Sequence, residues 1–276
     1  MIGDMLLPTV VMPLLVMLAA AAASLRLSWA PAVGVLLAIL GAFGWIQGFR
    51  LNHLLEPAAM DGLWLMTLVA VLAASLGRRQ GAALMLLGLP ISVWVVWVFA
   101  GSIGPVVWVS QALALLVPVA LVASGADNPD DSPTTTDFWM PGFLVAPVAV
   151  LAPTVGLAGS IKLAEIAGAM GVVMAVCWWV ARGAPLIADW QVPRLWQRLL
   201  PCLTLPLMWV ALTAYHLVEV PAVALLAAAL PWLVGSLFRA RLEASRWWLK
   251  LVVLVLVTAL PLAFSLWYVW PEQSLY

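Results

Sequence analysis

The sequence predicts an all-α fold: a polytopic helical membrane protein with about ten transmembrane helices, both termini outside and a possible internal duplication. Two observations carry the fold class. Hydrophobic residues make up 66% of the 276 positions, and the mean hydropathy is +1.12. A soluble domain cannot hide so much apolar surface from water. Many apolar runs also approach the about 20 residues that a helix needs to cross a bilayer core.

Polar, glycine-containing and proline-containing breaks between the apolar runs place the individual spans. The predicted spans cover roughly residues 5–25, 29–49, 63–77, 81–100, 105–124, 138–160, 163–182, 199–218, 221–238 and 247–269. Asp4 stands where a signal peptide has basic residues, so the first run is interpreted as a span. The 63–77 run is short and needs thinned lipid or support from neighbouring helices. The uncharged 81–124 stretch is too long for one span, so a tight reversal is predicted at 101–105.

The basic residues indicate the orientation of the chain. All but two of the 12 lysines and arginines fall in the loops after spans 1, 3, 7 and 9. The two exceptions are Arg50 and Lys162. Loops rich in lysine and arginine stay in the cytoplasm. The sequence therefore predicts an integral protein of the plasma membrane, the inner membrane of a bacterium, with both termini on the periplasmic side.

The longest polar loop divides the chain into two membrane halves. Residues 125–137 form an acidic cytoplasmic linker rich in proline, serine and threonine, between a first half at 1–124 and a second half at 138–276. Short resemblances, such as 87–90 with 203–206, suggest that the halves are duplicated. Binding sites of repeat-built transporters lie between the repeats.

Three similar short sequence motifs contain polar residues at the predicted outer ends of spans 2, 7 and 8. In each motif a histidine or lysine precedes a glutamate by three residues, a spacing that places both side chains on one helical face. The predicted substrate-binding residues are His53, Glu56, Lys162, Glu165, His216 and Glu219. No catalytic residue is assigned, and the sequence leaves the cofactor unknown.

These three motifs have three possible interpretations. Two imidazoles and two carboxylates from His53, Glu56, His216 and Glu219 could bind zinc, manganese or iron, although the order reverses the Glu-x-x-His of helical bundles. The same groups could instead form a gate for a solute or for protons. The third interpretation is helix-end chemistry, because Pro57 and Pro221 follow closely and proline often marks the end of a helix.

Tryptophan and cysteine are assigned structural roles. Most of the 17 tryptophans lie near span ends and predict an interfacial aromatic belt. The examples are Trp29, Trp45, Trp139, Trp209, Trp247, Trp248 and Trp270. Cys177 and Cys202 lie in separate apolar runs without metal-binding spacing, and they are predicted to be packing residues.

The composition excludes some classes of function and leaves others open. Zero net charge and scattered basic residues give no reason to expect nucleic acid, and phosphate-loop, nucleophile-elbow and zinc-protease motifs are missing from the sequence. The first hypothesis is a permease or facilitator for a small solute, with its pathway between the two halves and a polar outer mouth. The alternative is a non-catalytic accessory subunit with other membrane subunits as partners. A third is an outer-face enzyme that modifies lipid or glycan. In each case the bilayer is the surrounding partner.

Overall fold

The computed structural model describes residues 5–23, 30–48, 62–75, 83–88, 90, 140–183 and 192–270. All regular structure in these residues is helical, with no strand, as the sequence predicted. The chain begins with the short π-helix η1 (Leu7–Val11) and continues through α-helices. The α-helices are α2 (Met12–Ala23), α3 (Ala30–Gln47), α4 (Gly62–Ser75), α8 (Met140–Leu157), α9 (Ile161–Gly183), α10 (Val192–Leu217), α11 (Ala222–Leu237), α12 (Arg239–Ala244) and α13 (Trp247–Val269).

The observed helices lie where the apolar runs placed them, with one clear difference at α10. The last helix coincides with the predicted 247–269 span. Helix α10 begins at Val192, seven residues before the predicted 199. Of the predicted 81–100 span only residues 83–88 and 90 are described, and the predicted 105–124 span and the 125–137 linker lie outside the described residues.

Three described helices are long and apolar enough to cross a membrane. They are Ala30–Gln47, Ile161–Trp179 within α9, and Trp247–Val269. Four further apolar helices are shorter: Leu7–Ala23, Gly62–Ala73, Val145–Leu157 and Ala222–Gly235. By length and composition, the described part of the chain is a helical bundle suited to a membrane.

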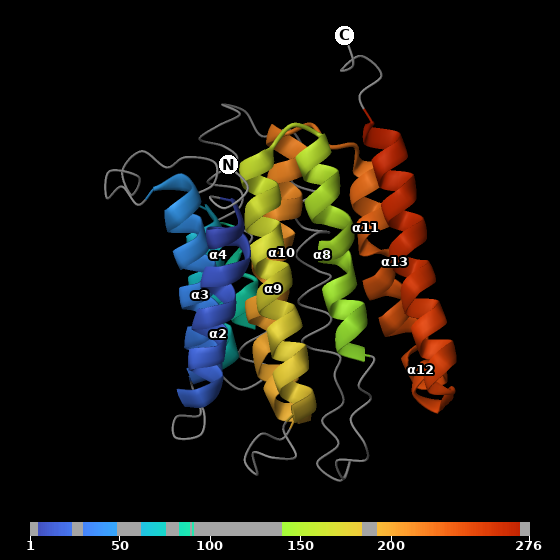
Figure 1. Cartoon of the computed structure of the whole chain (residues 1–276), viewed down its shortest axis with the longest axis horizontal. Helices are drawn as coiled ribbons and strands as arrows, with labels where there is room; N and C mark the ends of the chain where they lie inside the picture. The colour runs from blue at the N-terminus through green and yellow to red at the C-terminus, as the bar shows by residue number, and fades with distance from the viewer. Residues whose placement is uncertain are drawn as a thin grey trace.

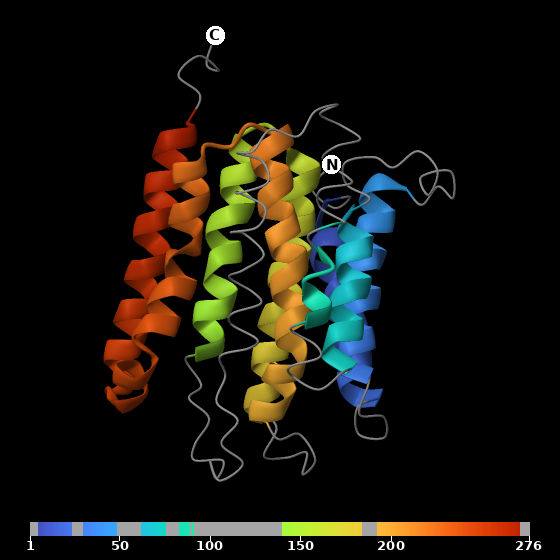
Figure 2. The same ribbon diagram turned by 180° about the vertical axis from the view of Figure 1, so that it is seen from behind.

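The described helices pack as two groups that meet at α9 and α10 (Figures 1 and 2). Helices α2, α3 and α4 lie on one side, where α2 and α3 pack on α9, and α4 packs on α10. Helices α8, α11 and α13 lie on the other side and pack on one another, with α8 also lying against α9. The second half of the chain thus contacts the first half directly through α9 and α10.

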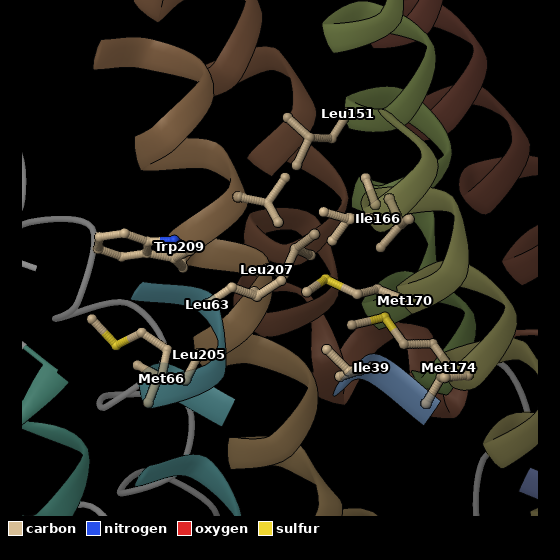
Figure 3. Packing of buried hydrophobic residues seen from close by; sticks show 14 of the residues in the cluster. Ile39, Leu63, Met66, Leu151, Ile166, Met170, Met174, Leu205, Leu207 and Trp209 are labelled. Atoms are coloured by element: carbon tan, nitrogen blue, oxygen red, sulfur yellow. The ribbon is translucent and has the colours of Figure 1, made fainter. Parts of the chain in front are cut away.

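The buried cluster runs through the centre of this arrangement (Figure 3). Leu63 and Met66 of α4, Met170 and Met174 of α9, and Leu207 of α10 are all buried in it. Close approach of the helices depends on small residues: a Cβ added at Gly171 of α9 would lie 2.9 Å from Val148 of α8. Without a hydrophobic driving force in lipid, such close backbone packing is a main source of helix association.

Helix α13 lies at the edge of the bundle and carries exposed apolar side chains along most of its length. Only 17% of its apolar window is buried. Exposed aromatic residues stand near both ends, with Trp247 and Trp248 at one end and Trp267, Tyr268 and Trp270 at the other. The helical rise places Trp248 and Trp267 about 28 Å apart, close to the roughly 30 Å thickness of a bilayer core. This face has the composition and the aromatic spacing of a lipid-facing surface.

Candidate functional site

Two of the three motifs of the predicted site fall within the described residues, and both lie at the same end of the bundle, the upper end in Figures 1 and 2. The turn from α8 to α9 and the turn from α10 to α11 are both at this end. Lys162 and Glu165 lie in the first turns of α9, whereas His216 lies at the end of α10 and Glu219 follows that helix. The first motif, with His53 and Glu56, lies outside the described residues.

The turn before α9 is fixed by a complete C-terminal capping motif. The N–H of Ser160 donates to the carbonyl of Val155 at 3.2 Å, and the N–H of Gly159 donates to the carbonyl of Gly156 at 3.2 Å. Gly159 adopts a φ of 108°, which a side chain would disfavour. The hydroxyl of Ser160 then accepts a long hydrogen bond of 3.4 Å from the N–H of Leu163, in the first turn of α9.

Lys162 and Glu165 lie on one face of α9, as their spacing predicted. Lys162 is exposed and Glu165 is half-buried. Gly168 continues this face one turn further, and a Cβ added there would lie 2.8 Å from Cγ2 of Thr9 in η1. The face of α9 that carries Glu165 is therefore directed toward η1.

His216 and Glu219 do not share a helical face, contrary to the prediction from their spacing. Helix α10 ends at Leu217, and Glu219 lies beyond it in the left-handed region, with a φ of 58°. The N–H groups of Val218 and Val220 both donate to the carbonyl of Ala214, at 3.3 and 3.0 Å. This tight turn carries Glu219 out of the helical register and leaves its side chain exposed.

Two buried nitrogen atoms mark the upper part of α10. Nε1 of Trp209 and Nε2 of His216 are both buried, with no hydrogen-bond partner in the part of the chain that the structure describes. Seven residues separate them, so they lie on nearly the same face of the helix, two turns apart. The imidazole of His216 also packs edge-on against Tyr215, with 4.7 Å between ring centroids.

The face of α10 that carries Trp209 is directed toward α4. A Cβ added at Gly62, the first residue of α4, would overlap the indole ring of Trp209. Further along the same pair of helices, the thiol of Cys202 donates to the carbonyl of Ala70 at 3.6 Å. Figure 3 shows the indole of Trp209 on the side of α10 where Leu63 and Met66 of α4 lie. We call the packed surface between α4 and α10 the α4–α10 seam.

Further polar atoms lie along α10 near Trp209. Thr213 lies one turn above Trp209, and its buried hydroxyl donates to the Trp209 carbonyl at 2.8 Å, which leaves the oxygen able to accept a second bond. Proline at position 206 cannot donate to the carbonyl of Cys202, the bond that an uninterrupted helix would make there. Kinks and freed carbonyls of this kind are tolerated at membrane depth where they face protein or a cavity.

Trp209 is the residue that the sequence placed wrongly. It was assigned to the aromatic belt, yet only 3% of its surface is exposed. By contrast, the belt residues Trp45, Trp247, Trp248 and Trp270 are exposed. The available signal was its register: Cys202, Trp209 and His216 recur every seven residues, a spacing that places them on nearly one helical face.

Cofactor and metal chemistry receive limited support from the described residues. No group of three or more histidine, cysteine, aspartate or glutamate side chains converges within the described ranges. The predicted four-residue metal set includes His53 and Glu56, outside those ranges, so it stays a prediction. Cys177 and Cys202 are both buried and unbridged, as expected of packing residues.

No family model, curated protein or solved structure matches this chain. The class that the fold defines is an all-helical bundle with apolar helices long enough to cross a membrane. Any more specific function must be inferred from the α4–α10 seam and the polar residues at the upper end.

Proposed function

We propose that the protein is an integral membrane permease or facilitator for a small solute, with a pathway between the two halves of the chain. In this proposal the chain crosses a plasma membrane about ten times, and the upper end of the bundle faces outside. The outer mouth is lined by the six predicted residues: His53, Glu56, Lys162, Glu165, His216 and Glu219. The pathway follows the α4–α10 seam, because α4 belongs to the first half and α10 to the second.

One observation carries the proposal: among the described residues, the buried nitrogens of Trp209, in the seam, and of His216, two turns further along nearly the same face of α10, have no hydrogen-bond partner. A buried polar atom without a partner is costly in an apolar medium. Such atoms persist in native proteins where water, an ion or a ligand satisfies them. Two of them on one face, near the predicted outer end, suit a pathway that is wet or holds a solute.

The decisive experiment measures whether water reaches the seam, and it requires no knowledge of the solute. Both native cysteines are replaced by alanine, and Thr213→Cys is introduced on the seam side of α10. The matched control is Ala214→Cys, which is buried at nearly the same depth but points away from the Trp209 face. Intact cells are treated with a membrane-impermeant, charged methanethiosulfonate reagent, and the labelled fraction is measured by mass spectrometry.

A pathway open to the outside predicts labelling of Thr213→Cys and little labelling of Ala214→Cys. Failure to label Thr213→Cys would remove the pathway from the seam. Equal labelling of both variants would also contradict the proposal, because it would reflect general opening of the helix and not a specific pathway.

A further inference from the structure

Helix α11 carries an exposed apolar stripe that leads directly into a basic turn. Its exposed large apolar side chains recur at intervals of three and four residues, which places them on one face of the helix. They are Val223, Leu226, Leu230, Leu233 and Leu237. The stripe extends over about 21 Å along the helix axis, and Leu237 at its lower end is 76% exposed. The chain then forms α12, at the lower end of the bundle in Figures 1 and 2.

The turn from α11 to α13 concentrates positive charge. Residues 239–250 contain four of the 12 lysines and arginines of the chain and a single acidic residue, Glu243. Arg241 in α12 and Arg246 at the amino end of α13 are both exposed, whereas Lys250 is buried. A surplus of basic residues directly beside a membrane helix is typical of segments that bind anionic phospholipids.

Hydrogen bonds fix the backbone that carries the two arginines. The N–H of Leu242 donates to the carbonyl of Phe238 at 2.8 Å, and the side chain of Leu242 is buried. The hydroxyl and the N–H of Ser245 both donate to the carbonyl of Leu242, at 2.7 and 3.0 Å. Because the turn is already ordered, a ligand that binds the arginines has little backbone entropy to overcome.

Exposed aromatic residues indicate the depth of this turn in a membrane. Trp247 and Trp248 follow Arg246 directly, and both are exposed. Indole rings favour the headgroup region of a bilayer, and the exposed apolar side chains of α13 continue from this point. The arginines therefore lie at the level of the lipid phosphates, and the apolar faces of α11 and α13 lie at the level of the acyl chains.

We propose that the turn between α11 and α13 binds the headgroups of anionic phospholipids, with Arg241 and Arg246 donating hydrogen bonds to their phosphate groups. A guanidinium keeps its charge at every physiological pH and can bind phosphate through two parallel hydrogen bonds. In the predicted orientation this turn lies at the cytoplasmic leaflet, whose surface is negatively charged. The inference goes beyond the proposed solute pathway and does not depend on it.

A lipid fits this surface better than a soluble acidic partner does. Exposed apolar side chains precede the arginines at Leu237 and Phe238 and follow them at Trp247 and Trp248. Water would cover these side chains at a cost in free energy, whereas acyl chains and the headgroup region cover them favourably. The combination of basic and apolar groups matches the two parts of a phospholipid.

The test is a lipid competition that is measured by native mass spectrometry. The full-length protein is purified in mild detergent and incubated with equal amounts of phosphatidylglycerol and phosphatidylcholine that carry the same acyl chains. The unaltered protein should retain phosphatidylglycerol preferentially, and this preference should fall as the salt concentration rises. Arg241→Gln and Arg246→Gln should each lower the ratio of bound phosphatidylglycerol to bound phosphatidylcholine about fivefold.

Two further variants serve as controls. Arg241→Lys combined with Arg246→Lys keeps both charges and should retain most of the preference, which separates loss of charge from damage to the turn. Lys162→Gln removes one exposed charge at the opposite end of the bundle and should leave the lipid preference unchanged. If one glutamine variant fails to fold, the other still locates the preference.

Three outcomes would overturn the inference. The first is equal retention of the two lipids, or a preference that both glutamine variants keep. The second is displacement of phosphatidylglycerol by sodium phosphate but not by sodium chloride at the same ionic strength, because the turn would then bind free phosphate. The third is a dimer or a co-purified protein chain that the glutamine variants lose in place of lipid, because a protein would then occupy this surface.

Discussion

Gly159 and Glu219 both adopt positive φ angles, but they differ in how well their residue type suits that backbone. Gly159, at φ 108°, closes α8 and has nothing within 4 Å of an added Cβ. Glycine is therefore required at position 159 by the backbone conformation and not by a lack of space. Glu219, at φ 58°, carries a Cβ that disfavours this left-handed backbone, so the turn between α10 and α11 holds it at a cost in free energy. Residues held in this region outside glycine often mark functional sites, which agrees with the placement of Glu219 at the proposed mouth.

Substitution at Gly159 tests the capping motif. Gly159→Ala should lower the free energy of unfolding by about 1–2 kcal/mol, because a Cβ disfavours the left-handed backbone. Gly159→Asn should cost less, since asparagine tolerates positive φ better than alanine does. Unfolding of the purified protein in mixed micelles, followed by circular dichroism, gives both values. Equal stability of all three proteins would contradict the assignment of the cap.

At the scale of elements, α13 is the helix whose environment is most clearly defined by its side chains. Its exposed apolar face and its two aromatic ends match a bilayer in composition and in length. Neighbouring α11 and α8 cover the opposite side, where Ser265 donates from its buried hydroxyl to the Ala224 carbonyl of α11 at 3.3 Å. The helix is thus anchored on one side and apolar on the other.

A charge in the middle of the exposed face of α13 should be poorly tolerated if lipid covers it. Leu256 is exposed and lies near the centre of the helix. Leu256→Lys should cost roughly 2.5–3.5 kcal/mol for insertion at mid-membrane depth, whereas Leu256→Ala should have a small effect. The measurement is the fraction of each variant that is recovered as folded protein in the membrane. Normal recovery of the lysine variant would indicate that water, and not lipid, covers this face.

At the scale of the whole molecule, the described helices join the two halves of the chain through α9 and α10. Helices α8 to α11 run alternately toward the upper and the lower end of the bundle. Helix α8 runs up to the turn at 158–160, and α10 runs up to the turn at 218–221. Apart from Lys162, the basic residues of the described part lie toward the opposite end, with exposed Arg241 and Arg246 between α11 and α13. The predicted orientation places this lower end in the cytoplasm.

Reporter fusions test that orientation. Alkaline phosphatase fused after Tyr276 should be active, because the carboxyl terminus is predicted outside, and green fluorescent protein at the same position should be dark. The control fusion follows Ser245, in the turn between α12 and α13, and should give the reverse pattern. Fluorescence at the carboxyl terminus together with phosphatase activity after Ser245 would show that the predicted orientation is inverted.

The sequence by itself determined the all-helical class and the approximate positions of the described helices. Apolar composition and the spacing of polar breaks are local properties, so the ends of α3, α11 and α13 were predicted to within about two residues. The placement of Lys162 and Glu165 on one helical face was also predictable, because no glycine or proline separates them at the start of the apolar run.

Only the tertiary structure decided which of these helices are neighbours and which side chains are buried. The sequence could not show that Trp209 packs against the first residue of α4, because the two are far apart in the chain and an apolar aromatic residue suits lipid and protein alike. Nor could it show that α10 ends before Glu219, since that turn depends on the left-handed backbone between α10 and α11. In a bundle whose exterior is as apolar as its interior, composition identifies a helix, but packing alone determines which face of it is buried.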